Sequence, residues 1–187
     1  LGTSPTGGLS GNQAIVPAGR VEVAGSQGAY SLNIASGTTD TGGRVHVLGG
    51  ATLSIQDSTV IGSTGTLDIT GSFDTFTLNS AAGSTIILNV GSSLTVDDGA
   101  SSTAAFVGTL GASTLDGNGL TITQLTLSGG PLSGLSDYTA NGTTLTSGQT
   151  INQSAGSTAT LRNLDDFAGP HNLTKTGDGS VLLNTNN

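Results

Sequence analysis

The sequence predicts an all-β chain that folds as a parallel β-helix, a rod of short strands wound into stacked coils. Three observations predict this fold: short runs of alternating apolar and polar residues, glycine-rich turns between the runs, and a degenerate internal repeat. Gly, Thr and Ser make up 84 of the 187 residues, and only six residues are aromatic. Such a chain lacks the large side chains that fill a globular core, but it suits a thin core of stacked Val, Ile and Leu.

The alternating runs supply the expected strands. In nearly all of them every second residue is Val, Ile, Leu or Phe and the others are polar, which is typical of a strand with one buried face. No window carries a sustained apolar stripe with the 3.6-residue period of a helix, and glycine interrupts most of the chain. The runs, in chain order, are Arg20–Ala24, Tyr30–Ile34, Arg44–Leu48, Thr52–Gln56, Thr66–Thr70, Thr75–Asn79, Thr85–Val90, Ser93–Asp97, Ala104–Val107, Leu120–Ile122, Leu125–Leu127, Thr143–Thr146, Thr158–Arg162 and Ser180–Asn184.

A repeated figure favours stacked coils. GGATLSIQDS, STGTLDITGS and VGSSLTVDDG each place small residues, a Leu-polar-Ile or Leu-polar-Val strand and a polar turn in the same order, at irregular spacings of 14 and 27 residues. Each figure is too short to bury its own apolar face, so it must stack on a neighbour. About eight coils spaced by about 4.8 Å would give a rod roughly 40 Å long. The residues expected to point inward are Leu53, Ile55, Leu67, Ile69, Leu78, Leu88, Leu94 and Val96.

Two features of the architecture stay open at this point. Strand spacings of about 8–12 residues also fit an antiparallel β-sandwich, which is the alternative fold. Three segments break the alternating pattern. Leu1–Gly11 is rich in Gly, Ser and Pro and is expected to form a flexible arm or cap, which leaves residues 12–187 as a single solenoid domain. Segments 129–141 and 164–171 alternate poorly and contain Pro131 and Pro170, so irregular structure is expected there.

The most informative stretch is LTKTGDGSVLLN, residues 173–184. It holds a strand, a turn with glycines at positions 177 and 179, and a second strand with Val181 and Leu183 on one face. This stretch resembles the autotransporter-associated β-strand repeat of secreted bacterial passenger domains. The resemblance implies a right-handed parallel β-helix at the surface of a bacterium or outside it. Because the chain does not begin with Met, we expect a removed leader or a segment of a longer protein.

Composition narrows the function classes. A net charge of −8 with only four Lys and Arg residues opposes nucleic-acid binding, because phosphate contacts need cations. The absence of cysteine excludes disulfides and cysteine metal sites. No stretch approaches the roughly 18 apolar residues of a transmembrane helix.

The sequence predicts no catalytic or cofactor site. His46 lies between Val45 and Val47, so its side chain should face solvent. The adjacent pairs Asp97–Asp98 and Asp165–Asp166 do not supply two carboxylates facing one bond, as glycoside cleavage requires. Weak calcium ligands are the only metal candidates, and ordinary turn chemistry explains them as well. They are Asp97, Asp98, Asp116 and Asn118.

These observations predict a secreted structural or adhesive β-solenoid, without enzymatic activity, in an extracellular fibre, filament or surface layer. Uncapped ends of a β-helix expose unpaired backbone groups, so we expect head-to-tail contact with copies of itself through Leu1, Leu9, Val181 and Leu183. The cell surface or the extracellular matrix is a further expected partner. The alternatives are a carbohydrate-active β-helix enzyme and a carbohydrate-binding or ice-binding solenoid. Outward threonines suggest the last of these, although the irregular spacing opposes a regular ladder.

Overall fold

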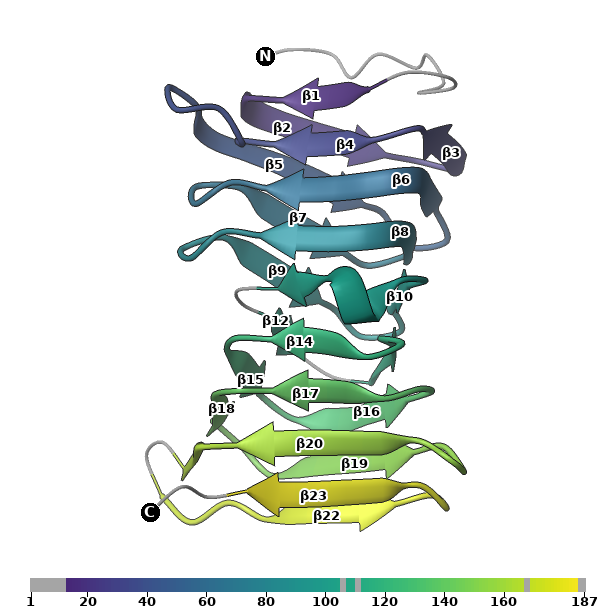
Figure 1. Cartoon of the computed structure of the whole chain (residues 1–187), viewed down its shortest axis with the longest axis vertical. Helices are drawn as coiled ribbons and strands as arrows, with labels where there is room; N and C mark the ends of the chain where they lie inside the picture. Colours follow the sequence, from purple (N-terminus) through teal and green to yellow (C-terminus); the bar gives the residue numbers. More distant parts are fainter. Residues whose placement is uncertain (1–12, 105–106, 110–111, 167–168, 185–187) are drawn as a thin grey trace.

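The chain forms a parallel β-solenoid of about eight coils (Figure 1). The computed structural model describes residues 13–104, 107–109, 112–166 and 169–184. Every strand pair among these residues is parallel, so the predicted β-helix is confirmed and the antiparallel β-sandwich is wrong. The described residues contain one short helix, the 3-10 turn η1 (Gly99–Ser101), and no helix that could span a membrane.

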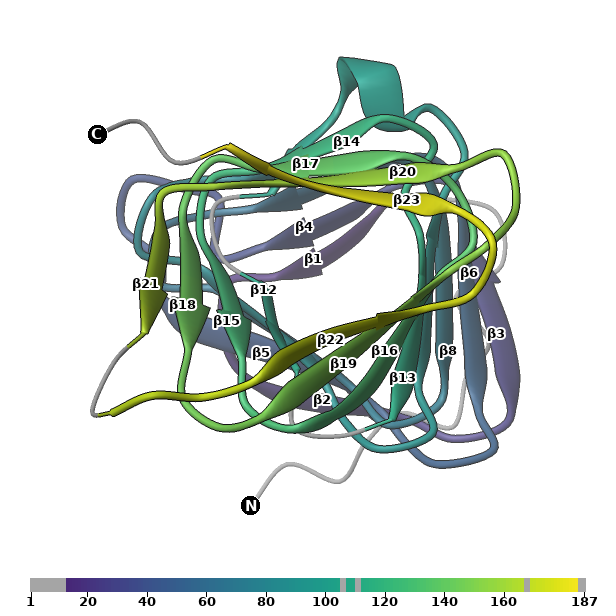
Figure 2. The ribbon, with the colours of Figure 1, turned by 90° about the horizontal axis from the view of Figure 1, so that it is seen from below.

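Each coil passes over three sides of the rod in a fixed order, side 2, side 1 and side 3 (Figure 2). Side 1 contains β1 (Ala14–Val16), β4 (Leu32–Ile34), β11 (Thr103–Ala104), β14 (Leu120–Ile122), β17 (Tyr138–Ala140), β20 (Thr158–Arg162) and β23 (Ser180–Asn184). Side 2 contains β3 (Ser26–Ala29), β10 (Ser93–Val96), β13 (Ser113–Asp116), β16 (Gly130–Gly134), β19 (Gln149–Gln153) and β22 (Leu173–Thr176). Two long strands, β6 (Thr52–Ile61) and β8 (Ser72–Ser80), bend from side 2 onto side 1 and join both sides into one sheet. Side 3 contains β2 (Ala18–Val23), β5 (Thr41–Val47), β7 (Thr66–Ile69), β9 (Thr85–Leu88), β12 (Val107–Thr109), β15 (Leu125–Leu127), β18 (Thr143–Leu145) and β21 (Leu164–Asp166).

The core consists of inward side chains stacked in axial columns. On side 3, Val45, Leu67 and Ile86 are direct neighbours across β5, β7 and β9, and none is more than 2% exposed. All eight residues that the alternating pattern placed inside are buried, which confirms that prediction. Each buried aliphatic side chain contributes about 1.5–3 kcal/mol relative to an exposed one, so the column carries much of the fold's stability.

The true coil differs from the repeat seen in the sequence. Leu53 pairs with Phe73, and Phe73 pairs with Leu94, so these three residues share one column of side 2. Leu67, by contrast, lies on β7 of side 3. The 14-residue spacing therefore joins two sides of the rod rather than two coils. Small-residue turns flank strands on every side, which is why the figure recurs out of phase with the coil.

Two segments that were expected to be irregular are more regular than predicted. Segment 129–141 contributes β16 and β17, and Tyr138 is only 1% exposed. Alternation is hard to see there because Gly134 takes an inward position, while Pro131 is tolerated near the start of β16. Segment 164–171 begins with β21, which continues side 3.

The expected N-terminal arm lies outside the described residues, and so do Leu1 and Leu9. Its flexibility and the single-domain division of residues 12–187 stay predictions.

Candidate functional site

One longitudinal edge of the rod, where each coil turns from side 2 to side 1, gathers acidic residues. We call it the acidic edge, and it comprises residues 30–31, 56–58, 76–77, 97–102, 117–119, 135–137, 154–157 and 177–179. Its bends and turns hold Asp57, Asp97, Asp98, Asp137 and Asp178. Asp74 and Asp116 occupy neighbouring outward positions on β8 and β13. Seven of the chain's twelve acidic residues therefore lie on or beside this edge.

The acidic edge also exposes large apolar side chains. Tyr30 is 54% exposed, Phe76 46% and Leu135 49%. The alternation in Thr75–Asn79 predicted that Phe76 would be buried with Leu78, and this is wrong for Phe76. Thr75 takes the inward position instead, because β8 bends between its two halves. No local pattern in Thr75–Asn79 marks that bend.

The four calcium candidates lie on or beside the acidic edge, and the side chains of two of them make hydrogen bonds with the backbone. Asp98 accepts a hydrogen bond from the Ser101 backbone N–H at 3.3 Å and caps η1. The side-chain amide of Asn118 donates to the Val96 carbonyl at 2.9 Å. Among the described residues, no group of three or more His, Asp or Glu side chains could hold a metal ion. Turn stabilisation explains Asp98 and Asn118, and calcium binding by Asp97 or Asp116 stays a prediction.

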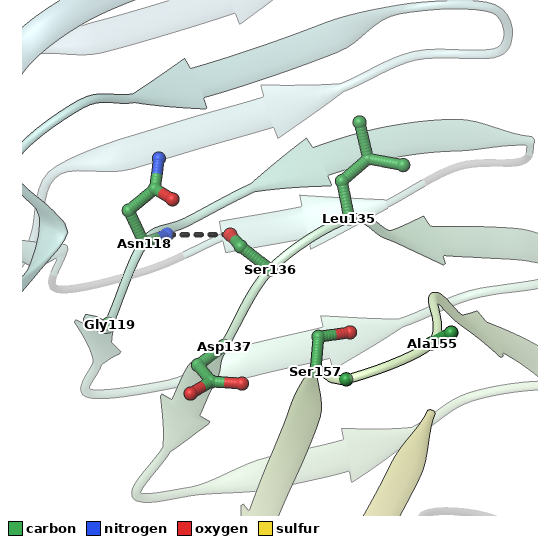
Figure 3. A pocket seen from close by; sticks show the side chains of 8 residues that line it. Asn118, Gly119, Leu135, Ser136, Asp137, Ala155 and Ser157 are labelled. Carbon is green, nitrogen blue, oxygen red and sulfur yellow. Dashed lines mark hydrogen bonds between the residues drawn. The ribbon is translucent and has the colours of Figure 1, made fainter. Parts of the chain in front are cut away.

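A shallow hollow opens on this edge between neighbouring turns (Figure 3). The Asn118 backbone N–H donates to Ser136 Oγ at 2.7 Å, and the Asp137 carboxylate accepts from the Thr158 backbone N–H at 2.6 Å. Ser157 Oγ donates to a carbonyl oxygen of its own turn at 2.7 Å. These polar side chains tie each turn to itself or to the next, which is a structural role.

Asp74 is the acidic-edge neighbour with a raised pKa. Its Oδ1 atom is buried and has no hydrogen-bond partner. Burial, and to a lesser degree the negative charge of Asp97 on the next coil, raise the pKa of the Asp74 carboxyl. The folded rod therefore disfavours the ionised form of this side chain.

We predict that Asp74→Asn stabilises the rod at neutral pH. Because folding raises the pKa of Asp74, its contribution to stability is lost as the pH rises from the ordinary aspartate value through the raised one. Removing the charge should increase the free energy of unfolding by about 0.5–1 kcal/mol near pH 7, with little change near pH 3. Urea unfolding at both pH values measures this difference. Asp137→Asn is the control and should not stabilise, because Asp137 already accepts a backbone hydrogen bond.

Side 3 carries a polar network that the sequence analysis missed. The Arg20 guanidinium lies 2.6 Å from His46 Nδ1 and 2.7 Å from Glu22 Oε1. His46 Nε2 lies 3.2 Å from Thr70 Oγ1. Because a guanidinium only donates, Nδ1 of His46 accepts and Nε2 carries the proton directed at Thr70. The His46 side chain faces outward, as predicted, but it is only 16% exposed and is no isolated surface residue.

Asp68 is the buried carboxylate of this network, at 5% exposure. It accepts hydrogen bonds from Arg44 and, at 2.6 Å, from the side-chain amide of Asn89. Burial acts to raise the pKa of Asp68, but the hydrogen bonds from Arg44 and Asn89 and the nearby His46 outweigh it, so the pKa is lowered. The network joins four successive coils and acts as a lateral staple. The outward phase of Arg44, His46 and Asp68 in RVHV and TLDI was the available signal.

Side 2 carries an unbroken column of small polar residues. Direct register pairs align Ser26, Thr52, Ser72, Ser93, Thr114, Ser133, Asn152 and Thr176. Irregular spacing in the sequence therefore does not break an axial ladder. The adjacent outward column contains Asp74, Thr95 and Asp116, so this side is not a uniform threonine surface of the kind expected for ice binding.

Val181 and Leu183 are the predicted assembly residues that the structure describes. Both occupy inward columns of β23, where Val181 packs against the core and Leu183 is 55% exposed. Lys175 lies on β22, in the same coil as β23, and takes an inward position because it is in register with Ile151 of β19. A charge in that position opposes the addition of a further strand.

The remaining histidine pairs with a carboxylate away from the acidic edge. His171 Nδ1 lies 2.5 Å from Asp166 Oδ1, and the His171 backbone N–H donates to the same carboxylate at 2.8 Å. These hydrogen bonds, the backbone one first, lower the pKa of Asp166. Asp165 is exposed on β21, and Asp97 and Asp98 lie in a turn of the opposite sheet. The structure therefore does not bring the two carboxylate pairs together.

The fold and its surfaces define the chain as a parallel β-solenoid. Comparison with protein-family models found no match, and searches of curated proteins and of solved structures returned no significant match. The resemblance of residues 173–184 to the autotransporter-associated repeat stays a hypothesis.

Proposed function

We propose that this chain is a secreted bacterial structural or adhesive rod, part of an extracellular fibre, filament or surface layer, and not an enzyme. The observation that carries the proposal is the continuity of the stack: about eight coils share one apolar core. The polar groups described above mostly connect one coil to the next, which suits a structural rod. The resemblance of the sequence of residues 173–184 to the autotransporter-associated β-strand repeat supports a location at the bacterial surface.

The adhesive part of the proposal rests on the acidic edge. A rigid rod presents this edge along its length, and Tyr30, Phe76 and Leu135 expose apolar surface among carboxylates. Exposed large apolar side chains rimmed by polar groups mark interaction surfaces.

The fibre part of the proposal predicts concentration-dependent association of the purified chain. Sedimentation velocity and electron microscopy measure it. Leu183→Asp should weaken end-to-end contact by placing a charge on an exposed inward position, whereas Lys175→Leu should strengthen it by removing one. Monomers at every concentration, for Lys175→Leu as well, would refute end-to-end assembly.

A further inference from the structure

We propose that the acidic edge around Tyr30 and Phe76 is a docking surface for a cationic polypeptide segment rich in Lys or Arg. The inference deepens the adhesive role proposed above and rests on it for its biological setting. It does not depend on end-to-end assembly, because these two residues lie on the lateral surface of the rod.

Tyr30 and Phe76 form a short aromatic ridge with Asp57 between them. The Asp57 backbone N–H donates to the Tyr30 carbonyl at 2.9 Å, and β6, which holds Asp57, pairs with β8, which holds Phe76. The two aromatic residues are thus two coils apart, or about 9.6 Å at the usual strand spacing. About half of each of these two residues is exposed. The chain has only six aromatic residues, and it places these two on its surface rather than in its core.

Three carboxylates beside the ridge lack a cationic partner within the described chain. Asp57 Oδ2 accepts only from the Ser58 hydroxyl, at 3.1 Å, and no ion pair in the described residues involves Asp57, Asp74 or Asp97. The chain's own cations are engaged or distant. Arg20 and Arg44 pair with carboxylates on side 3, and the other two, Arg162 and Lys175, lie in the last two coils.

The combination of rings and unpaired carboxylates selects the partner's chemistry. Ammonium and guanidinium groups are attracted to the faces of Tyr and Phe and to carboxylates, so one kind of group uses both features. A polyanion would be repelled by Asp57, Asp74 and Asp97. A neutral glycan could stack on the rings but would leave the carboxylates uncompensated. A single metal ion would not use the rings.

Fluorescence anisotropy with a labelled oligolysine peptide tests this inference on the full chain. We expect binding that weakens as salt rises, and no binding of a matched oligoglutamate peptide. The double variant Tyr30→Ser and Phe76→Ser keeps every charge and should bind oligolysine about tenfold more weakly. Leu182→Ser is the matched control, because it removes an exposed apolar side chain of β23, away from the ridge, and should bind as the unaltered chain does.

Two outcomes would overturn the inference. Equal affinity of the double variant and the unaltered chain would mean that net negative charge alone attracts the peptide. Binding of a neutral oligosaccharide at the ridge, without binding of oligolysine, would identify a glycan surface. Circular dichroism melting curves verify that each variant is folded. Phe76→Tyr keeps an aromatic ring at this position and should bind as the unaltered chain does, whereas Phe76→Ser should bind more weakly. Repeating the measurement in the Leu183→Asp background, which should weaken end-to-end contact, separates a failure of binding from a failure of assembly.

Discussion

Replacing Leu67 with aspartate should abolish folding of the rod. Leu67 is fully buried at the centre of β7, between Val45 and Ile86 of the adjacent coils. A carboxylate in this column has no partner, and burial of an unpaired charge costs several kcal/mol. That cost approaches the total stability of about 5–15 kcal/mol that is usual for a domain. Because coils contact only their neighbours, the defect disrupts the stack on both sides.

The measurement for Leu67→Asp is its solubility and its thermal unfolding followed by circular dichroism. Thr66→Asp is the control, since Thr66 precedes Leu67 on the same strand and faces outward. That variant should remain within about 1 kcal/mol of the unaltered chain. A soluble Leu67→Asp protein that melts cooperatively would contradict the assignment of Leu67 to the core.

The phase of the strands was predictable because the core is simple. In segments such as TLDIT and SLTVD, alternate aliphatic residues can only point to one face, and that face must be covered. Parallel stacking then places like residues in one column, as Leu94 and Leu115 show on side 2. No long-range information was needed for this part of the fold.

The length of the coil was not predictable, because the corners accept loops of different size. Leu32 pairs with Thr59 one coil later, whereas Leu120 pairs with Tyr138 after a much shorter interval. Extra residues leave the rod at the corners without disturbing the columns. Strand β16 was not predicted because Gly134 occupies an inward position where an aliphatic residue was expected. The Gln153 side chain fills the space beside Gly134 and donates to the Ser136 carbonyl at 2.9 Å and to Ser157 Oγ at 2.8 Å.

The candidate site was predictable only in part. Turn chemistry correctly indicated that Asp97, Asp98 and Asn118 lie at corners. The edge itself arises from stacking, which aligns Asp57, Asp97 and Asp137 although they are far apart in the sequence. No local pattern encodes that alignment, since it depends on the loop length of every coil between them.

Gly62→Val should cause the second large loss of stability, for a steric reason. Gly62 follows β6, and its backbone N–H donates to the Ile34 carbonyl at 2.8 Å. A Cβ atom on Gly62 would overlap the Ala35 carbonyl group and crowd the Ser36 Cα of the preceding coil. Backbone atoms cannot rotate away as a side chain can, so the two coils would have to separate. We expect a loss of about 3 kcal/mol or more in the free energy of unfolding.

Gly148→Val is the matched control for Gly62→Val, because it introduces the same side chain without the same collision. A Cβ atom at Gly148 would make only one ordinary contact, 3.9 Å from the Asn172 carbonyl oxygen, and the residue is exposed. Neither glycine has the left-handed backbone conformation that side chains avoid. The control should therefore shift stability by no more than about 0.5 kcal/mol, and urea unfolding midpoints compare the two variants. Equal midpoints would show that the coils around Ala35 can separate without cost, which close packing of their backbones does not allow.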